Sequence, residues 1–473
     1  MELNQKLVEQ VVAQVVQAYG GSPATGTSCC CADAGNYGIF SDMDSAVQAA
    51  KKAQEEYMDH PLADRRKYIQ TIRDVILKEE NLKYISKLTV EETGMGDYHC
   101  KVVKNRAAAE LTPGLEDLTT GALTGDDGLT TIEYSPYGVI GAITPTTNPT
   151  ETIINNSIGM LAAGNSVVFS PHPRAKNVTL HTIVMINKAL EEVGAPKNLI
   201  VTVSEPSVEN TQKMMQHPLV RMLVCTGGPG IVKQVLSSGK KAIGAGPGNP
   251  PVVVDETADI EQAAKDIVSG CAFDNNLPCI AEKEVLAVDS IADYLMFNMK
   301  KNGAYQVDDP AVIQKLVDLV VTEKGGPKTD FVGKSASYIL DKVGISVGKE
   351  IRVITMDVPK DHPFVQIELM MPILPIVRVP DVDTAIDWAV ECEHGNRHSA
   401  MMHSKNIDKL TKMAKKIQTT IFVKNGPSYA GIGIGGEGYT TFTIAGPTGE
   451  GLTSAKSFAR TRRCVLVKGL SVR

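Results

Sequence analysis

The stretch GVIGAITPTTNPTETIINNSIGMLAAGNSVVFS covers residues 138–170 and carries the pattern that predicts the fold. It begins with an apolar strand at 138–144, continues with a helix at 149–163, and ends with a second apolar strand at 166–169. Two strands separated by one helix favour parallel pairing with a right-handed crossover. This unit is typical of a Rossmann-like α/β domain.

The same alternation extends in both directions along the chain. The sequence predicts helices at 42–57, 65–85, 177–193 and 230–236, and strands at 199–203 and 221–225. A second alternating block begins near Val252 and includes strands at 284–288, 373–377 and 420–423. Because 473 residues is about three times a typical domain, we expect two α/β domains, at 37–245 and 246–438.

Composition excludes several classes of protein. The formal net charge is -6, which provides no basic field for nucleic acid, and no apolar run is long enough to span a membrane. The basic cluster Arg460, Arg462 and Arg463 is interpreted as a solvated or interface strip. The nine cysteines lack the even spacing of a disulfide framework, and no secretory pattern opens the chain. We therefore expect a cytoplasmic protein, with no metal held by the adjacent thiols of Cys29–Cys31.

The first 36 residues form a separate segment. Apolar residues recur at helical spacing from Leu3 to Tyr19 with polar residues between them, which predicts an amphipathic helix at 1–19. Small residues and the breaker GGSP at 20–23 then predict a flexible linker at 20–36. The helix either docks into a groove of a partner or folds back on its own subunit, and the residues alone leave both open.

Ligand-binding residues are expected at the carboxyl ends of parallel strands. The candidate turns there are 144–148, 170–173 and 226–230. The third is a glycine turn that opens a helix, where backbone N–H groups and the helix dipole favour a phosphate. Such turns are common, and the spacing is not that of the dinucleotide-binding fingerprint.

Three cysteines in the second half differ in their surroundings. Cys271 lies on the apolar stripe of a helix that starts near Asp259, and Cys225 ends a buried strand, so both are predicted to be core residues. Cys279 follows the loop 275–278 and is a candidate nucleophile. Its position alone does not distinguish a reactive thiol from an inert one.

Several long motifs resemble the aldehyde dehydrogenase superfamily, and more closely its CoA-acylating members in bacterial microcompartments for ethanolamine or propanediol use. The resemblance covers the chain from Tyr37 onward. The matching strings are TPTTNP at 144–149, AGNSVV at 163–168, AGPGNPPVVV at 245–254, FDNN at 273–276, ELMMP at 368–372 and FVKNGP at 422–427.

The resemblance implies the catalytic residues. Cys279 attacks the aldehyde to give a thiohemiacetal, and hydride transfer leaves an enzyme thioester. Asn148 and the backbone N–H of Cys279 stabilise the tetrahedral oxyanion. Asn148 is equally suited to cap a helix that has Pro149 at its first position. Glu368 corresponds to the glutamate that holds the nicotinamide ribose; the alternative is a solvent-facing carboxylate at a strand end.

The resemblance also implies NAD as cofactor and coenzyme A as co-substrate. It assigns Thr226, Gly227 and Gly228 to the pyrophosphate and Ser170, His172 and Pro173 to the adenosine side. Hydrolytic relatives carry a lysine after this strand, whereas Ser170 here is smaller and leaves room, and the ring of His172 is able to stack on adenine. The expected cofactor-binding set is completed by Thr144, Pro145, Thr146, Ala245 and Gly246.

One departure from hydrolytic relatives favours thiol transfer. Those enzymes carry a Glu-Leu-Gly-Gly segment whose carboxylate activates water, whereas residues 245–248 here are AGPG. Loss of a general base typically costs ~10²- to 10⁴-fold in rate. Glu368 and His398 are the alternative candidates for a base. Of these, His398 is a weak candidate and is better interpreted as a structural hydrogen-bonding residue. A thiol such as CoA is a strong nucleophile once ionised.

We therefore expect an NAD-dependent enzyme that oxidises acetaldehyde or propionaldehyde to the acyl-CoA. A hydrolytic aldehyde dehydrogenase and a non-catalytic microcompartment scaffold are the alternatives. The resemblance further implies that residues 1–19 bind shell proteins as an encapsulation peptide and that the enzyme works in the microcompartment lumen. It also implies a homodimer or homotetramer, built through a small β-extension from segments near 115–135 and 439–473.

Overall fold

A computed structural model describes residues 37–470 of the chain. The predicted helix at 1–19, the linker at 20–36 and Cys29–Cys31 lie outside these residues. Within 37–470, no helix is both long and apolar enough to cross a lipid bilayer.

The first sheet of the described chain contains six parallel strands. They are β1 (Ile39–Phe40), β4 (Val139–Thr144), β5 (Ser166–Pro171), β6 (Ile200–Val203), β7 (Val220–Thr226) and β8 (Lys241–Ala245), in the spatial order β1-β6-β5-β4-β7-β8. The chain runs outward from β4 through β5 to β6 and then returns to the other side of β4 as β7. The connections therefore reverse direction between β4 and β7, which is where open α/β sheets bind ligands.

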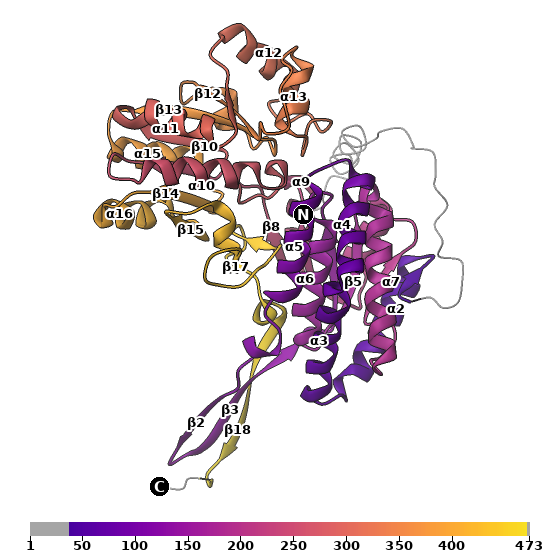
Figure 1. Cartoon of the computed structure of the whole chain (residues 1–473). Helices are drawn as coiled ribbons and strands as arrows, with labels where there is room; N and C mark the ends of the chain where they lie inside the picture. The colour runs from indigo at the N-terminus through magenta and orange to yellow at the C-terminus, as the bar shows by residue number, and fades with distance from the viewer. Residues whose placement is uncertain (1–36, 471–473) are drawn as a thin grey trace, which may run out of the picture. The chain divides into compact units, whose positions relative to one another are not determined.

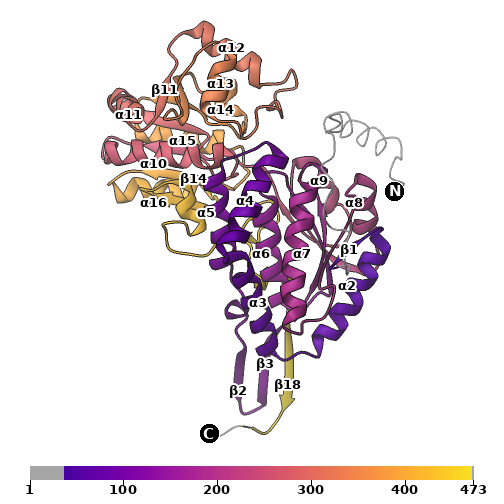
Figure 2. The ribbon, with the colours of Figure 1, turned by 45° about the vertical axis from the view of Figure 1, so that its right-hand side comes forward.

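Helices cover both faces of this sheet because the strands are apolar on both sides. Val139 and Ile143 of β4 pack with one group of helices, and Ile140 and Ala142 pack with the other. The first group is α2 (Met43–Met58), α8 (Val208–Gln216) and α9 (Pro229–Leu236). The second is α6 (Pro149–Ala162) and α7 (Lys176–Glu192), against which α3 (Leu62–Leu77), α4 (Glu79–Thr93) and α5 (Tyr98–Glu110) form a further layer, as Figures 1 and 2 show.

The prediction of one helix at 65–85 is wrong. The chain forms α3 and α4, separated at Lys78, whose φ of -58° and ψ of 122° are not helical. Apolar side chains continue across the break, with Ile76 before it and Leu82 after it both fully buried. The periodicity therefore survives a bend that neither glycine nor proline marks.

The second sheet has seven parallel strands in the described chain, in the order β11-β12-β13-β10-β9-β14-β15. The chain crosses to it between β8 and β9, that is, between Ala245 and Pro251. α10 and α11 pack on one face, and α12, α13, α15 and α16 on the other. The strands are β9 (Pro251–Val254), β10 (Glu284–Val288), β11 (Ala304–Gln306), β12 (Val353–Asp357), β13 (Ile373–Val379), β14 (Ser399–His403) and β15 (Ile421–Lys424). The helices are α10 (Ile260–Ala272), α11 (Asp289–Lys301), α12 (Pro310–Val320), α13 (Ala336–Lys342), α14 (Pro363–Gln366), α15 (Val382–Cys392) and α16 (Ile407–Ile417).

A small antiparallel sheet joins β2 (Gly121–Gly125), β3 (Gly128–Pro136) and β18 (Ala459–Val467), which lie side by side in Figures 1 and 2. Most of β18 is exposed, including the three arginines of the basic cluster. This strand begins later than the predicted segment at 439–473. Residues 440–458 instead pack on the main body, where Phe458 is buried against Gly159 of α6. They include β16 (Ile444–Ala445), β17 (Gly451–Leu452) and the short helix η5 (Ala455–Phe458).

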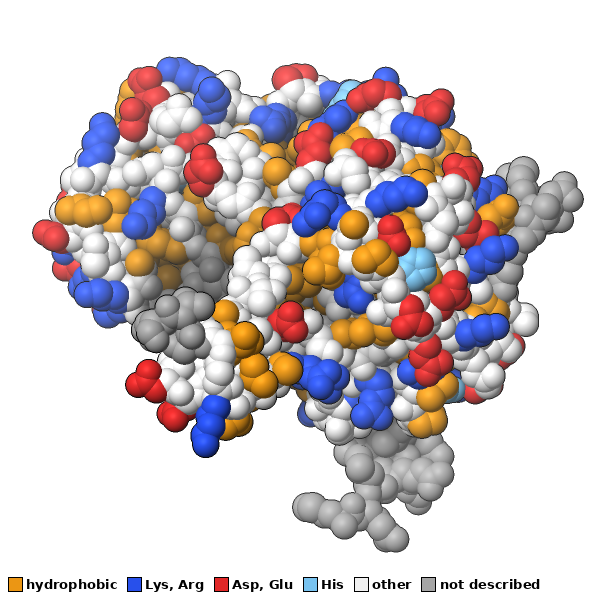
Figure 3. All heavy atoms as spheres, turned by 90° about the horizontal axis from the view of Figure 1, so that it is seen from below, with side chains coloured by type: hydrophobic (Ala, Val, Ile, Leu, Met, Phe, Trp, Pro, Cys, Tyr) orange, Lys and Arg blue, Asp and Glu red, His pale blue; other side chains and the backbone are white. Residues whose placement is uncertain are grey.

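The surface carries mixed charge. On the face drawn in Figure 3, lysine and arginine side chains alternate with aspartate and glutamate. This mixture agrees with the small net charge of the sequence.

Candidate active site

The proposed cofactor residues of two turns lie at the carboxyl ends of neighbouring strands. Thr144 ends β4 and Thr226 ends β7. Gly227 and Gly228 then lead into α9, with Gly228 at its N-cap. A Cβ atom at Gly227 would lie 3.0 Å from Cγ2 of Ile231, so a larger residue would require that side chain to shift. These residues fit a nucleotide, because the N-terminus of α9 favours a phosphate and the buried Thr144 hydroxyl has no hydrogen-bond partner among the described residues.

The residues proposed for the adenosine side lie at the carboxyl end of β5 and directly after it. Ser170 is buried in this strand and its Oγ lies 2.7 Å from Oγ1 of Thr211 in α8. His172 accepts a hydrogen bond from the Arg174 N–H at 3.1 Å, and Pro173 begins a short 3₁₀ helix, η2 (Pro173–Ala175). Burial lowers the pKa of His172 to about 4, so its ring is neutral at physiological pH. A neutral flat ring is able to stack on a base.

The candidate site residues of the second half lie at the amino ends of strands, whereas the sequence led us to expect ligand-binding residues at carboxyl ends. Cys279 precedes β10, Glu368 precedes β13, His398 precedes β14, and Gly248 precedes β9. These four strands are consecutive in the sheet order. The amino ends of the second sheet therefore bring together residues that are up to 150 positions apart in the sequence.

Cys279 is half-buried in the loop between α10 and β10. Burial raises the pKa of its thiol to about 12; the nearby Glu368 raises it further, while Lys283 and Lys104 act in the opposite direction. The thiol is therefore protonated at neutral pH in the free protein. Cys225 and Cys271 are fully buried in the core, as predicted.

The turn before Cys279 has an unusual backbone. Asp274, Asn275 and Asn276 have φ values of 51°, 54° and 65°, in the left-handed region that Asp and Asn adopt more readily than other non-glycine residues. Side chains hold this conformation: the Asn275 amide donates to the Gly333 carbonyl at 2.9 Å, and the Asn276 amide donates to the Glu282 carbonyl at 3.0 Å. Nζ of the buried Lys283 donates to Oδ1 of Asn276 at 2.5 Å. The left-handed turn is thus fixed by several bonds.

The absence of a side chain at Gly248 allows the Cys279 loop and the His398 ring to lie close to the backbone of this residue. A Cβ atom at this position would lie 2.8 Å from the Cys279 carbonyl oxygen and 2.9 Å from Cγ of His398. Burial raises the pKa of Glu368, and its carboxylate is partly stabilised by Lys283 and by the Gly248 backbone. Glu368 is half-buried in the loop between α14 and β13. The segment 245–248 brings no titratable side chain to this place.

His398 is a buried neutral ring. Its Nδ1 lies 2.9 Å from Ser399 Oγ, and Nε2 has no hydrogen-bond partner among the described residues. Burial lowers its pKa to about 4.

Asn148 stands at the N-cap of α6, with Pro149 at the first helical position, but its side chain makes no capping hydrogen bond. Instead its Oδ1 accepts from Nζ of Lys104 at 2.5 Å. Lys104 belongs to a fully buried group of four charges that also contains Lys101 of α5, Glu151 of α6 and Asp274. The sequence analysis did not find this ion cluster (Lys101, Lys104, Glu151 and Asp274). The only signal was the spacing of two lysines one turn apart after the N-cap residue Asp97.

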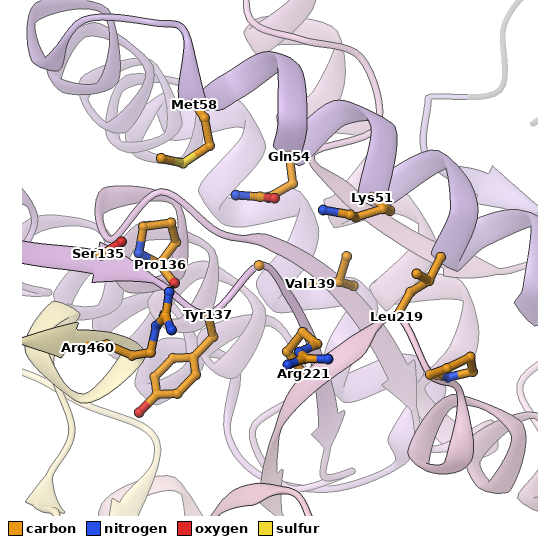
Figure 4. A pocket seen from close by; sticks show the side chains of 12 residues that line it. Lys51, Gln54, Met58, Ser135, Pro136, Tyr137, Val139, Leu219, Arg221 and Arg460 are labelled. Atoms are coloured by element: carbon orange, nitrogen blue, oxygen red, sulfur yellow. Dashed lines mark hydrogen bonds between the residues drawn. The ribbon is translucent and has the colours of Figure 1, made fainter.

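A surface cavity of about 370 Å³ lies elsewhere (Figure 4). Lys51, Arg221 and Arg460 line it together with residues at the amino ends of β4 and β7. Thr144 and Thr226 end the same strands, so this cavity is separate from the candidate active site.

The model of the aldehyde dehydrogenase family matches residues 21–317 and 351–447, and the chain therefore belongs to this family. Both the predicted fold class and the predicted family are confirmed.

Within the family, the chain is similar to acylating enzymes. It is 52% identical to the propanal dehydrogenase (CoA-propanoylating) of Citrobacter freundii, over 92% of this chain and 94% of the relative. It is 68% identical to the propionaldehyde dehydrogenase of Rhodopseudomonas palustris solved with bound CoA and an acylated cysteine, with a TM-score of 0.92 over 92% of this chain and 100% of the other. A propionaldehyde dehydrogenase from the fucose utilisation bacterial microcompartment of Clostridium phytofermentans is 52% identical, with a TM-score of 0.90 over the same two shares.

Proposed function

We propose that this protein oxidises a short aldehyde, propionaldehyde or acetaldehyde, to its acyl-CoA with NAD as oxidant. The observation that carries the proposal is the loop thiol of Cys279 beside a segment, 245–248, that has no carboxylate to activate water. The similarity to the acylating enzymes supports the same reaction.

The first chemical step forms a bond between the Cys279 sulfur and the aldehyde carbon. The thiol gives its proton to solvent, the carbonyl π pair moves to oxygen as the S–C bond forms, and the resulting oxyanion accepts hydrogen bonds from the Asn148 amide and the Cys279 N–H. One such donor typically contributes ~10²- to 10³-fold to the rate. The turn at 274–276 holds the thiol in position during this step.

The second step removes a hydride from the same carbon and leaves an acyl thioester on Cys279. When bound, NAD would accept this hydride. It is proposed to be held by residues from several turns, with Ser170, His172 and Pro173 at the adenosine end, Ala245, Gly246 and Glu368 at the nicotinamide end, and Thr144, Pro145, Thr146, Thr226, Gly227 and Gly228 as the other contacts.

The third step transfers the acyl group to CoA. The CoA thiol gives up its proton and its sulfur attacks the thioester carbon, the bond to Cys279 breaks, and the leaving Cys279 thiolate takes up a proton to restore the thiol. Water is a poor competitor, because no carboxylate at 245–248 removes its proton and the pKa of His398, lowered by burial to about 4, makes its ring a weak proton acceptor. A hydrolytic reaction is therefore disfavoured.

Formation of NADH tests this function directly. With propionaldehyde, NAD and CoA we expect steady turnover; without CoA we expect a burst of about one NADH per active site and then near arrest. Cys279→Ala should abolish both phases, and Cys464→Ala, at an exposed cysteine of β18, is the matched control. Steady turnover without CoA would identify a hydrolytic enzyme, absence of NADH formation by the wild type would leave the scaffold alternative, and full activity of Cys279→Ala would contradict the proposed role of Cys279.

We also propose a microcompartment location, with residues 1–19 binding shell proteins and the β2–β3–β18 sheet joining subunits. A relative from a microcompartment and the amphipathic pattern of residues 1–19 support the first part. The exposed apolar side chains of Val465 and Val467 support the role of the β2–β3–β18 sheet in joining subunits.

Two deletions test these proposals. Deleting 1–19 should leave kcat unchanged and abolish co-sedimentation with purified shells. Deleting 459–473 should shift the protein to a smaller species in size-exclusion chromatography. A large fall in kcat in the first variant, or an unchanged elution volume in the second, would contradict the respective proposal.

A further inference from the structure

We propose that Lys104 is a positioning residue that fixes which end of the Asn148 amide faces the reaction, and that Glu151 and Asp274 hold Lys104 for this purpose. The inference rests on the proposed role of Asn148 as an oxyanion donor. It assigns a function to a buried ion cluster that the catalytic steps do not otherwise use.

The amide of an asparagine can be turned by 180° with almost no change in shape, so its orientation must be set by its partners. Nζ of Lys104 lies 2.5 Å from one end of the Asn148 amide. A lysine ammonium donates hydrogen bonds and accepts none, so the atom that it contacts must be the carbonyl oxygen. The NH₂ group therefore occupies the other end, where it contacts only the Thr147 hydroxyl, at 3.3 Å, among the described residues. Its second hydrogen remains for the substrate oxygen.

The ion cluster keeps Lys104 charged in spite of its burial. Burial lowers the pKa of Lys104, but Asp274 and Glu151 outweigh this effect and raise it above the ordinary value. Nζ lies 2.5 Å from Asp274 and 3.0 Å from Glu151, and all three side chains are inaccessible to solvent. A lysine that lost its proton could accept from the amide and would no longer impose one orientation.

The same cluster ties Asn148 to the loop of the nucleophile. Asp274 is the first residue of the left-handed turn before Cys279, and its Oδ1 accepts from the Asp97 N–H at 2.8 Å. Asp274 thus connects α5, through Lys104, with the left-handed turn. The oxyanion donor and the nucleophile are positioned by one set of charges.

Lys101 provides a matched control within the cluster. Its Nζ lies 3.0 Å from Asp274 and 3.8 Å from Glu151, but it donates to the backbone carbonyl of Thr147 and not to the Asn148 amide. Lys101→Met and Lys104→Met each remove one buried amine from the cluster; burial lowers the pKa of Lys101, whereas Asp274 and Glu151 raise that of Lys104. An effect of packing alone would be similar in both variants.

The test measures how well propionaldehyde, without NAD, protects Cys279 from alkylation by iodoacetamide. Protection reports the thiohemiacetal, whereas alkylation forms no oxyanion. Because the protection constant comes from the ratio of rates with and without aldehyde, changes in thiol reactivity cancel. We expect Lys104→Met and Asn148→Ala each to weaken protection at least 10-fold and Lys101→Met less than 3-fold. Combining Lys104→Met with Asn148→Ala should add less than 3-fold to Asn148→Ala alone.

Equal losses in the two lysine variants, or full additivity with Asn148→Ala, would overturn the inference and leave the proposed function intact. Unchanged protection in Asn148→Ala would instead remove the proposed oxyanion donor. If Lys104→Met does not fold, two double variants replace the single ones: Lys104→Met with Glu151→Gln, and Lys101→Met with Glu151→Gln. Each removes one buried lysine together with one buried carboxylate, and the same outcomes are then compared between the two. Steady-state kinetics should agree, with a fall in kcat larger than the change in KM for Lys104→Met.

Discussion

Replacing Gly248 with alanine should damage catalysis through one added methyl group. The new Cβ would lie 2.8 Å from the carbonyl oxygen of Cys279 and 2.9 Å from Cγ of His398. Carbon atoms in proteins normally approach other heavy atoms to about 3.5 Å, so the Cys279 loop or the ring must move by roughly 0.5 Å or more. Overpacking of this kind costs about 1–3 kcal/mol in stability. A displacement of about 1 Å at a reacting group can cost about 100-fold in rate, so we expect roughly a 10-fold loss here.

The assay is NADH formation with propionaldehyde and CoA, measured beside urea-induced unfolding. Gly125→Ala is the matched control, because Gly125 has no neighbour within 4 Å of its added Cβ and lies in β2, far along the chain from the site. We expect kcat/KM to fall about 10-fold in Gly248→Ala and to change less than 2-fold in the control. Gly248→Ala with unchanged stability and kcat/KM would refute the close approach of the AGPG segment to Cys279.

Two further predictions concern protonation. Because the pKa of Cys279 is raised to about 12, mainly by burial, its alkylation by iodoacetamide in the free protein should accelerate about tenfold per pH unit from pH 7 to 10; a plateau near pH 8 would contradict this. Glu284 is fully buried, neither of its oxygens has a hydrogen-bond partner among the described residues, and burial raises its pKa well above 4.5. When folding raises the pKa of a carboxyl group, the free energy of unfolding decreases as the pH rises above the pKa that the group has in the unfolded state. The decrease is at most ~1.4 kcal/mol per pH unit. Glu284→Gln should therefore lose less free energy of unfolding than the wild type between pH 5 and pH 8, and equal losses would show that the group is not buried neutral.

The sheet strands were predictable from sequence because burial on both faces makes them apolar throughout. β4 and β5 are observed at the predicted positions, and so is α6 between them. The break at Lys78 was not predictable, because local backbone angles change there without any change in side-chain pattern. Helix α5 was missed for a related reason: its buried face includes Lys101, Lys104 and Asn105, which periodicity counts as polar.

Residues of the candidate site were predictable only where they belong to a sequence motif that resembles a known family. Cys279 and Asn148 came from strings that resemble a family, and so did Glu368. Lysines are almost never fully buried unless they are paired, and the pairing of Lys104 with Glu151 and Asp274 depends on three segments far apart in sequence. In parallel sheets, ligand-binding residues are expected at the carboxyl ends of the strands. Only the candidate residues of the first sheet lie there, since Cys279, Glu368 and His398 all precede their strands.

The stability of the acyl group on Cys279 tests the central claim most directly. The protein is mixed briefly with propionaldehyde and NAD, freed of small molecules, and divided between plain buffer and buffer with CoA, and the mass of the peptide that contains Cys279 is followed with time. The account predicts a propionyl adduct on Cys279 that persists in buffer and disappears at least ~10²-fold faster with CoA, the lower end of what a missing general base costs. No adduct on Cys279, or equal rates of loss in the two buffers, would contradict it.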